Sequence, residues 1–334
     1  MTSINLVAFE NGVGNSRDIV LLSRALGELG CEVTLTVPSK HARRRRKLRL
    51  VRGVAGARLR FARHREKRGR PAAFDVAVML EHAWPEQLHL ARRNVIVPNP
   101  EFFDRHDRAL LHSFDRVWAK TRNTLEIFAR LGCATDLTGF DGEDRYLADV
   151  AREPAFLHVA GRSRMKGTSR LVALWSRHPE WPTLTVVQSL PRASPAVAAS
   201  NIDFQTRFLT DVELRQLQNR HQFHVCTSET EGWGHYIVEA ESTGAIVLAT
   251  DAPPMNELVT PERGILLRAA ATGHQHLATT YQVGDAALEQ AVEIALGADA
   301  AERRRLGAAA RAWFWENKRG FPDRVASALG IVAA

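Results

Sequence analysis

The stretch 228–240 gathers residue types that bind anions and sugars, since it reads SETEGWGHYIVEA. It follows an apolar run and leads into a helical pattern, so Gly232 and Gly234 lie where a loop opens a helix. Glycines there let a ligand approach the backbone and leave helix N-terminal amides for an anion. Glu231 and Glu239 add carboxylates, which accept hydrogen bonds from sugar hydroxyls. Alternatively, the acids only complement the helix dipole and face solvent.

The elements that must position these residues alternate between strands and helices along the whole chain. Strands are expected at 4–9, 33–37, 74–80, 94–97 and 116–119, and then at 156–160, 184–187, 202–204, 223–226, 246–249 and 264–267. Helical patterns between them predict parallel sheets of βαβ units. Ser16 is expected to cap the first helix. Ligands of such sheets bind at the carboxyl ends of the strands.

This series predicts an α/β protein with two Rossmann-like domains. We expect an N-terminal domain over 1–150 and a second domain over 155–305, with a linker at 149–154. After residue 284 only helical patterns remain, and residues 306–334 are expected to form C-terminal helices.

Composition excludes several classes of protein. The chain has 334 residues, of which 45% are hydrophobic and 25% are charged, so it is neither disordered nor collagen-like. Three scattered cysteines are too few for a disulfide framework or a thiolate metal site. No apolar run approaches the ~18 residues of a transmembrane helix, and the N-terminus does not resemble a signal peptide. We therefore expect a cytoplasmic protein.

The positive charge is concentrated in one segment. Residues 41–70 hold fourteen Lys or Arg and one acid, hence +13, whereas the whole chain carries +8 and the remainder −5. The basic residues fall in two runs, Arg43 to Arg49 and Arg58 to Arg70, and apolar residues are interspersed with them over 43–52 and 58–63. This suits a helix on the inner face of an anionic membrane. Nucleic acid is a weaker alternative because Phe61 is the segment's one aromatic residue, and a solvated loop without a partner is a third.

The 228–240 motif resembles the Glu-x7-Glu signature of retaining GT-B glycosyltransferases, most closely family 4. Glu231 and Glu239 supply the two acids, with Gly232 and Gly234 after the first and a β-run after Gly244. The resemblance implies the GT-B fold, in which two Rossmann-like domains face each other across a cleft and the C-terminal helices, here 306–334, pack back on the N-terminal domain. It also implies a nucleotide-diphosphate sugar as donor.

The loop 161–167, GRSRMKG, is similar to the basic loop that opens the family's donor domain. The resemblance implies that Arg162 and Lys166 bind the diphosphate, because two fixed cations offset the negative charge of the leaving group without a metal. Arg164 is an alternative to Arg162 as the phosphate ligand. Alternatively, the loop is a solvated turn that binds no ligand. The family's second acid implies that Glu239 binds the ribose.

Further residues of the resemblance surround the transferred sugar and the acceptor. Glu231, Trp233, His235 and the Gly232–Gly234 amides would contact the sugar. His82, which follows the strand 74–80, matches a histidine that family members carry there and is expected to act near the reacting sugar. Gly14 belongs to a glycine-rich first loop on the donor side. The residues expected to contact the acceptor are Arg17, Asp18 and Asn99, with Glu101 a weaker candidate.

Together these features predict an enzyme that transfers a sugar with retention of anomeric configuration, in glycan or glycolipid synthesis. No metal or other cofactor is implied, since the chain lacks an Asp-x-Asp loop of the kind that metal-dependent enzymes use. The alternatives are a glycosyltransferase that modifies nucleic acid, a nucleotide-sugar 2-epimerase, and a non-catalytic binder of nucleotide sugars or anionic polymers.

Overall fold

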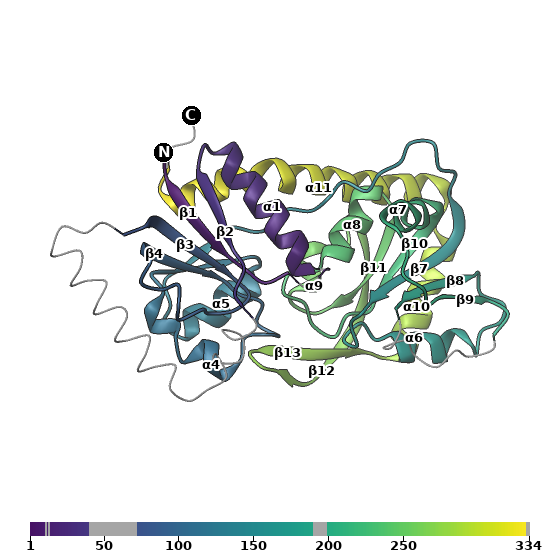
Figure 1. Ribbon diagram of the computed structural model, residues 1–334. Helices are drawn as coiled ribbons and strands as arrows, with labels where there is room; N and C mark the ends of the chain where they lie inside the picture. Colours follow the sequence, from purple (N-terminus) through teal and green to yellow (C-terminus); the bar gives the residue numbers. More distant parts are fainter. Residues whose placement is uncertain (11, 13, 40–71, 190–198, 332–334) are drawn as a thin grey trace. The chain divides into compact units, whose positions relative to one another are not determined.

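A computed structural model describes residues 1–10, 12, 14–39, 72–189 and 199–331 (Figure 1). The chain divides into two compact units. The first unit comprises Met1–Asp141, Gln275–Ala278 and Asn317–Ala334, and the second comprises Gly142–His274 and Thr279–Glu316. The basic segment 41–70, for which anionic partners are expected, lies outside the described residues.

In the described residues, the first unit is built on a six-stranded sheet of order β2-β1-β3-β4-β5-β6. Its strands are β1 (Ser3–Val7), β2 (Glu32–Thr36), β3 (Phe74–Leu80), β4 (Ala91–Val97), β5 (Arg116–Ala119) and β6 (Thr135–Leu137). Each neighbouring pair is parallel, so the carboxyl ends of all these strands lie along one edge. The last residues of β3 and β4 are fully buried, as expected for a parallel sheet covered on both faces.

Helices α1 (Gly14–Glu28), α4 (Arg105–Arg108) and α5 (Arg122–Arg130) and the 3₁₀-helix η1 (Leu111–Ser113) accompany this sheet. Helix α1 buries Ile19, Leu22 and Leu26, which recur at helical spacing. The prediction that Ser16 caps this helix is wrong, because α1 already begins at Gly14. The Ser16 hydroxyl instead accepts a hydrogen bond of 2.9 Å from the backbone N–H of Gly12 in the preceding turn.

In the described residues, the second unit holds a seven-stranded sheet of order β13-β12-β11-β10-β7-β8-β9. Its strands are β7 (Glu153–Gly161), β8 (Leu184–Gln188), β9 (Ile202–Gln205), β10 (His221–Cys226), β11 (Ile246–Asp251), β12 (Gly264–Gln275) and β13 (Ala278–Val283). Strands β7 to β12 pair in parallel. Strand β12 extends far beyond the predicted 264–267, because its residues after Leu267 are mostly exposed and give no apolar alternation. Strand β13 was not predicted, because its inner residues, Thr-Thr-Tyr-Gln, give no apolar alternation either.

The helices of the second unit are α6 (Thr168–Trp175), α7 (Asp211–Arg220), α8 (His235–Thr243), α9 (Met255–Leu258), α10 (Asp285–Gly297) and the first part of α11 (Ala300–Leu329). Aromatic rings fill the core between the sheet and α6. Phe156 of β7 stacks on Phe223 of β10 at 4.6 Å between centroids and meets Trp175 of α6 edge-on at 4.9 Å.

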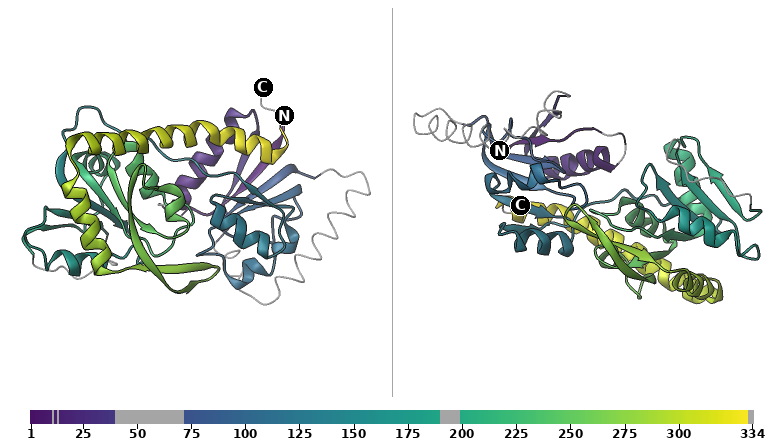
Figure 2. Two further views of the ribbon diagram at one scale, coloured as in Figure 1. Left: turned by 180° about the vertical axis from the view of Figure 1, so that it is seen from behind. Right: turned by 90° about the horizontal axis from the view of Figure 1, so that it is seen from below.

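Helix α11 is one continuous helix, yellow in Figures 1 and 2, rather than the separate helices expected after residue 306. Its residues from Asn317 onward belong to the first unit. There Lys318 pairs with Asp141 at 3.1 Å, and Phe321 packs against Phe140 at 5.2 Å between ring centroids. No helix in the described ranges is long and apolar enough to cross a membrane.

Candidate functional site

The two motif loops of the second unit lie side by side because of its strand order. The chain runs outward from β7 to β8 and β9, then returns so that β10 pairs with the other side of β7. The carboxyl ends of β7 and β10 are therefore neighbours at the point where the strand order reverses, which is where open α/β sheets bind ligands. The loops 161–167 and 227–234 follow these two strands. The backbone N–H of Glu229 donates to the carbonyl of Met165 at 2.8 Å and joins the loops.

Gly167 permits their close approach. Its φ is +68°, and a Cβ at this position would lie 2.7 Å from the carbonyl oxygen of Thr227. The Thr227 hydroxyl also donates to the carbonyl of Lys166 at 2.8 Å. Gly167 and Gly234 are the N-caps of α6 and α8. Because a glycine has no side chain, neither N-cap residue covers the positive end of its helix at this edge.

Lys166 and Glu231 form an ion pair between the two loops, although they are far apart in sequence. The two side chains are only 14% and 12% exposed. The Lys166 ammonium also lies 3.7 Å from the centroid of the Tyr236 ring, a cation–π contact. The ammonium is therefore held in one place by a carboxylate on one side and an aromatic face on another.

Ser228 and Tyr236 complete this cluster. The Ser228 hydroxyl donates to the Glu231 carboxylate and lies 2.5 Å from the Tyr236 hydroxyl. Burial raises the pKa of the Tyr236 phenol, and burial likewise raises the pKa of the neighbouring Cys226 thiol. Both groups are neutral at physiological pH, so neither brings a negative charge toward Lys166.

Glu239, the second acid of the motif, is buried on α8 with 1% of its surface exposed. The side-chain amide of Gln218 donates to its Oε2 at 2.9 Å. The side-chain oxygen of Gln218, Oε1, in turn accepts a hydrogen bond from Nε of Arg145 at 2.9 Å. Since arginine only donates and a carboxylate only accepts, this chain fixes which way the Gln218 amide points. Sequence reasoning missed Gln218 and Arg145 because neither lies in a motif.

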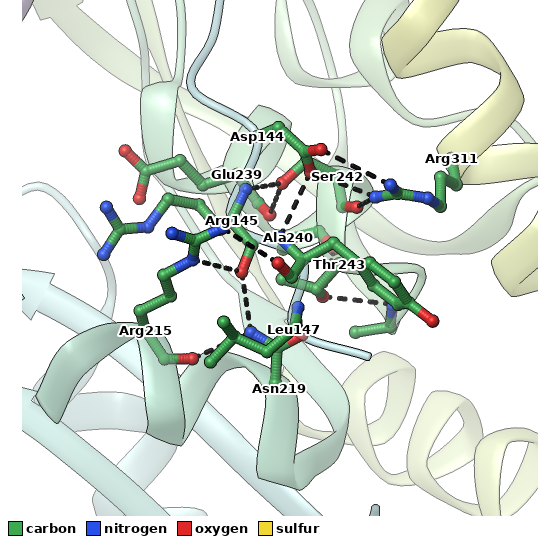
Figure 3. Close-up of polar contacts among 12 residues, drawn as sticks. Asp144, Arg145, Leu147, Arg215, Asn219, Glu239, Ala240, Ser242, Thr243 and Arg311 are labelled. Atoms are coloured by element: carbon green, nitrogen blue, oxygen red, sulfur yellow. Dashed lines mark hydrogen bonds and ion pairs between the residues drawn. The ribbon is translucent and has the colours of Figure 1, made fainter. Parts of the chain in front are cut away.

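Figure 3 shows how the backbone around Arg145 is anchored to α7 and α8. The Arg145 N–H donates to the Ser242 hydroxyl at 2.9 Å, and the Arg145 carbonyl accepts from Nε of Arg215 at 3.0 Å. The N–H of Leu147 donates to the Asn219 side chain at 2.9 Å. These bonds give the guanidinium that contacts Gln218 a rigid base.

The remaining predicted donor residues lie on the same two loops. Arg162 and Arg164 are exposed just after β7, and nothing in their burial separates them as phosphate ligands. Trp233 is buried with 5% exposure, whereas His235 is half-buried at the first position of α8. The loops thus bring together three basic residues, two glycine-capped helix ends and two carboxylates.

In the first unit, His82 lies at the corresponding reversal of strand order, between β1 and β3. Its ring stacks on Phe9, which follows β1, at 5.9 Å between centroids. Nδ1 of His82 lies 2.9 Å from Oδ2 of Asp107, whose Oδ1 accepts from the N–H of Ala83 at 2.8 Å. Asp107 is fully buried, so it fixes the imidazole ring and turns Nε2 away from itself.

Glu81 precedes His82 in an unusual conformation, with φ of +65°. Its side chain is 10% exposed, and Oε1 lies 3.4 Å from Nε2 of His82. Burial raises the pKa of this carboxyl. A left-handed backbone at a residue other than glycine is strained and is commonly found at functional sites.

Lys120 is a further charged residue of this edge that sequence reasoning missed. It follows β5 directly, is 2% exposed and forms an ion pair with Asp18. It also donates to Oδ1 of Asn99 at 3.0 Å and lies 4.5 Å from the centroid of the Phe140 ring. Asp18 and Asn99, both predicted acceptor residues, are thereby brought together. A basic residue at the end of a predicted strand was the available signal.

The other two predicted residues of this unit lie at the start of α1, where Gly14 is the first residue and Arg17 is half-buried. Glu101, the weaker candidate, is buried with 7% exposure.

Part of the chain is similar in sequence to a curated mannosyltransferase. No protein-family model matches the chain. The chain is 28% identical over 200 residues to the GDP-mannose:cellobiosyl-diphosphopolyprenol alpha-mannosyltransferase of Xanthomonas campestris. The aligned region covers 53% of this chain and 52% of that enzyme, so the chain spans about half the length of this curated relative.

Solved structures match over nearly the whole chain. Sucrose-phosphate synthase from Thermosynechococcus elongatus has a TM-score of 0.71 at 16% identity, covering 99% of this chain and 98% of that one. A glycosyltransferase from Rickettsia africae scores 0.69 at 14% identity, covering 98% and 97%. Anabaena HepE, in complex with UDP and glucose, scores 0.66 at 15% identity, covering 99% and 100%. At these identities the likeness establishes the fold alone, which is the GT-B fold of glycosyltransferases, with two Rossmann-like domains and a C-terminal helix.

Proposed function

We propose that the protein is a retaining, metal-independent glycosyltransferase of the family 4 type that uses a nucleotide-diphosphate sugar. The observation that carries this proposal is the joining of loops 161–167 and 227–234 at one sheet edge. This junction sets the Lys166 ammonium beside the glycine-capped N-termini of α6 and α8. A fixed cation and two helix ends favour a ligand with several negative charges, such as a diphosphate.

The chemistry follows from where charge develops. When the sugar leaves the donor, negative charge grows on the diphosphate, and Lys166 and Arg162 would stabilise it without a metal ion. Retention in the resembling family is described as attack on the same face as the leaving group, assisted by the leaving phosphate. No protein nucleophile is then needed. His82 would contact the reacting sugar from the first unit.

Glu239 would bind the ribose hydroxyls of the donor. A carboxylate offers about four acceptor sites, so the bond from Gln218 leaves capacity for hydroxyl donors. Because the Gln218 amide is fixed by Arg145, the orientation of Glu239 does not have to be established when the donor binds. Glu231, Trp233 and His235, with the amides of Gly232–Gly234, would orient the transferred sugar.

The acceptor proposal rests on the mannosyltransferase relative, whose name describes an acceptor linked to diphosphopolyprenol. We propose a lipid-linked or glycan acceptor, contacted by Arg17, Asp18 and Asn99. The basic segment 41–70 would draw the enzyme to the anionic inner face of a membrane, where such acceptors reside.

The test begins with GDP, UDP, ADP, CDP and dTDP in a thermal-shift screen with EDTA present. A ligand at about 100 times its Kd is expected to stabilise the fold by about 2.7 kcal/mol. GDP-mannose, and the nucleotide sugars of any other nucleotide that stabilises the protein, are then offered together with a polyprenyl-diphosphate glycan as acceptor. Release of the nucleoside diphosphate and an unchanged anomeric configuration by NMR would support the proposal.

Three results would instead favour the alternatives. If none of the five nucleotides raises the melting temperature, the proposed donor site is contradicted. Binding without turnover on glycan, lipid or DNA acceptors would indicate a non-catalytic binder. Transfer only to DNA would identify a nucleic-acid glycosyltransferase.

A further inference from the structure

The Lys166–Glu231 pair poses a problem for the donor site described above. The ammonium that would bind the diphosphate is already neutralised by a carboxylate. The two side chains are nearly buried, at 14% and 12% exposure, so the pair is far less screened than a surface salt bridge. A diphosphate cannot gain the full attraction of Lys166 while Glu231 stays in contact with it.

The groups around the pair make Glu231 the negative partner of Lys166 at this place. Burial lowers the pKa of His158 to about 4, so this imidazole is neutral. Burial raises the pKa of Tyr236 and of Cys226, so the phenol and the thiol are neutral as well. None of these three can replace the charge of Glu231.

Lys166 has a second support that does not depend on Glu231. The face of the Tyr236 ring lies 3.7 Å from the ammonium, and the Tyr236 hydroxyl is held at 2.5 Å from the Ser228 hydroxyl. Tyr236 begins the buried part of α8, so its ring is fixed by the fold. The ammonium therefore stays in position when its carboxylate partner changes.

We infer that Glu231 occupies the diphosphate's position on Lys166 in the unliganded site and is displaced when the donor binds. This inference rests on the proposed function. The exchange replaces one anion by another, so Lys166 is never left nearly buried without a counter-ion, a state that is strongly destabilising. The displaced carboxylate becomes an acceptor for a hydroxyl of the transferred sugar. Glu231 thus couples arrival of the diphosphate to recognition of the sugar.

The inference makes an unusual prediction for Glu231→Gln, which keeps the shape of the side chain and removes its charge. The nucleoside diphosphate no longer competes with an internal carboxylate, so GDP or UDP, whichever binds the wild-type protein, is expected to bind about tenfold more tightly, or about 1.4 kcal/mol. Turnover with the matching nucleotide sugar is expected to fall, because the amide is a poorer acceptor for a sugar hydroxyl.

Matched controls separate exchange on Lys166 from a general electrostatic effect. Glu229→Gln removes the same charge from the same loop, where the backbone of Glu229 bonds Met165 and Tyr281. It is expected to leave the affinity unchanged. In a Lys166→Ala background, Glu231→Gln is expected to lose its tightening effect, since the competition is for Lys166. Glu231→Ala serves as a second variant if the glutamine protein does not fold.

Calorimetric titration with GDP and UDP decides the matter. Unchanged or weaker nucleotide binding by Glu231→Gln and Glu231→Ala would overturn the exchange, and so would equal tightening by Glu229→Gln. If the wild-type protein binds nucleotide and turns over in either case, only the exchange fails. If no variant and no wild-type protein binds a nucleoside diphosphate, the proposed function fails with it.

Discussion

Acidification from pH 7 to pH 5 is expected to destabilise the second unit through two histidines buried in its sheet. His158 on β7 bonds the Val225 carbonyl at 2.8 Å and the Thr168 hydroxyl at 2.9 Å. His224 on β10 bonds the carbonyl of Gln218 at 2.9 Å. Burial lowers the pKa of His158 to about 4 and that of His224 to about 3.

The sign and size follow from proton linkage. In the unfolded chain each histidine titrates near pH 6.5, so the unfolded state binds more protons than the folded state below that pH. Stability is therefore lost as the pH falls from about 6.5 toward the folded pKa of His158, near 4, and of His224, near 3. At pH 5 the loss is about 2 kcal/mol for each residue, or about 4 kcal/mol for both. The total free energy of unfolding of a typical domain is about 5–15 kcal/mol.

Other groups titrate with different signs, so the histidine contribution must be isolated by substitution. Burial raises the pKa of Glu241 far above its usual range, which stabilises the folded state as the pH falls. His178 has its pKa raised by a hydrogen bond from its ring to Glu180, so it also opposes the two buried histidines. We therefore compare the change in unfolding free energy between pH 7 and pH 5 across variants.

The assay is urea unfolding at pH 7, 6 and 5, read by hydrogen exchange in β7 and β10 so that the signal comes from the second unit. His158→Asn and His224→Asn are each expected to remove about 2 kcal/mol of the change in unfolding free energy between pH 7 and pH 5. This holds however much each substitution destabilises the protein at pH 7. His178→Gln is expected to make the decline steeper. If the two asparagine variants keep the wild-type pH dependence, the argument from buried neutral histidines is wrong.

Three further predictions concern the proposed activity. Lys166→Ala is expected to lower turnover roughly 10²–10³-fold, the cost of losing one charged contact to the transition state. Steady-state nucleotide release measures this, and an unchanged rate would contradict the phosphate assignment. Asp107→Asn is expected to lower turnover on the order of 10–100-fold by releasing the His82 ring. It should have no further effect on turnover in a His82→Gln background, and an additive loss would speak against positioning. Replacement of the basic residues from Arg43 to Arg49 by glutamine is expected to weaken sedimentation with anionic vesicles, at about 1 kcal/mol per charge near the surface. Equal binding at low salt would favour a loop without a partner.

Local patterns were sufficient where local forces decide the structure. The predicted strands 74–80 and 116–119 coincide with β3 and β5, because buried apolar runs flanked by polar residues have few other conformations. The first helix was found but its start was misplaced, since the competing use of the Ser16 hydroxyl by Gly12 depends on the turn geometry. Strand β13 was missed because its inner residues, Thr-Thr-Tyr-Gln, give no apolar alternation.

The contacts of the site depended instead on strand order, which the sequence pattern does not specify. Both motif loops were identified, but the pairing of Lys166 with Glu231 follows from β10 lying beside β7 rather than beside β9. Lys120 was missed for a related reason. A lysine after a strand is usually solvated, and its burial against Asp18 becomes evident only when the first helix and β5 are placed in one unit.

The two reversals of strand order explain why the candidate residues fall where they do. In each unit the sheet is extended in one direction and then in the other, and ligands of open α/β sheets bind at such a reversal. In the second unit Lys166 and Glu231 lie at this reversal, and in the first unit Phe9 and His82 lie there. Each of these pairs joins residues from strands that are not consecutive in sequence. A substitution of one member of such a pair also removes a contact of the other member. Double variants such as Lys166→Ala with Glu231→Gln are therefore more informative than either single variant.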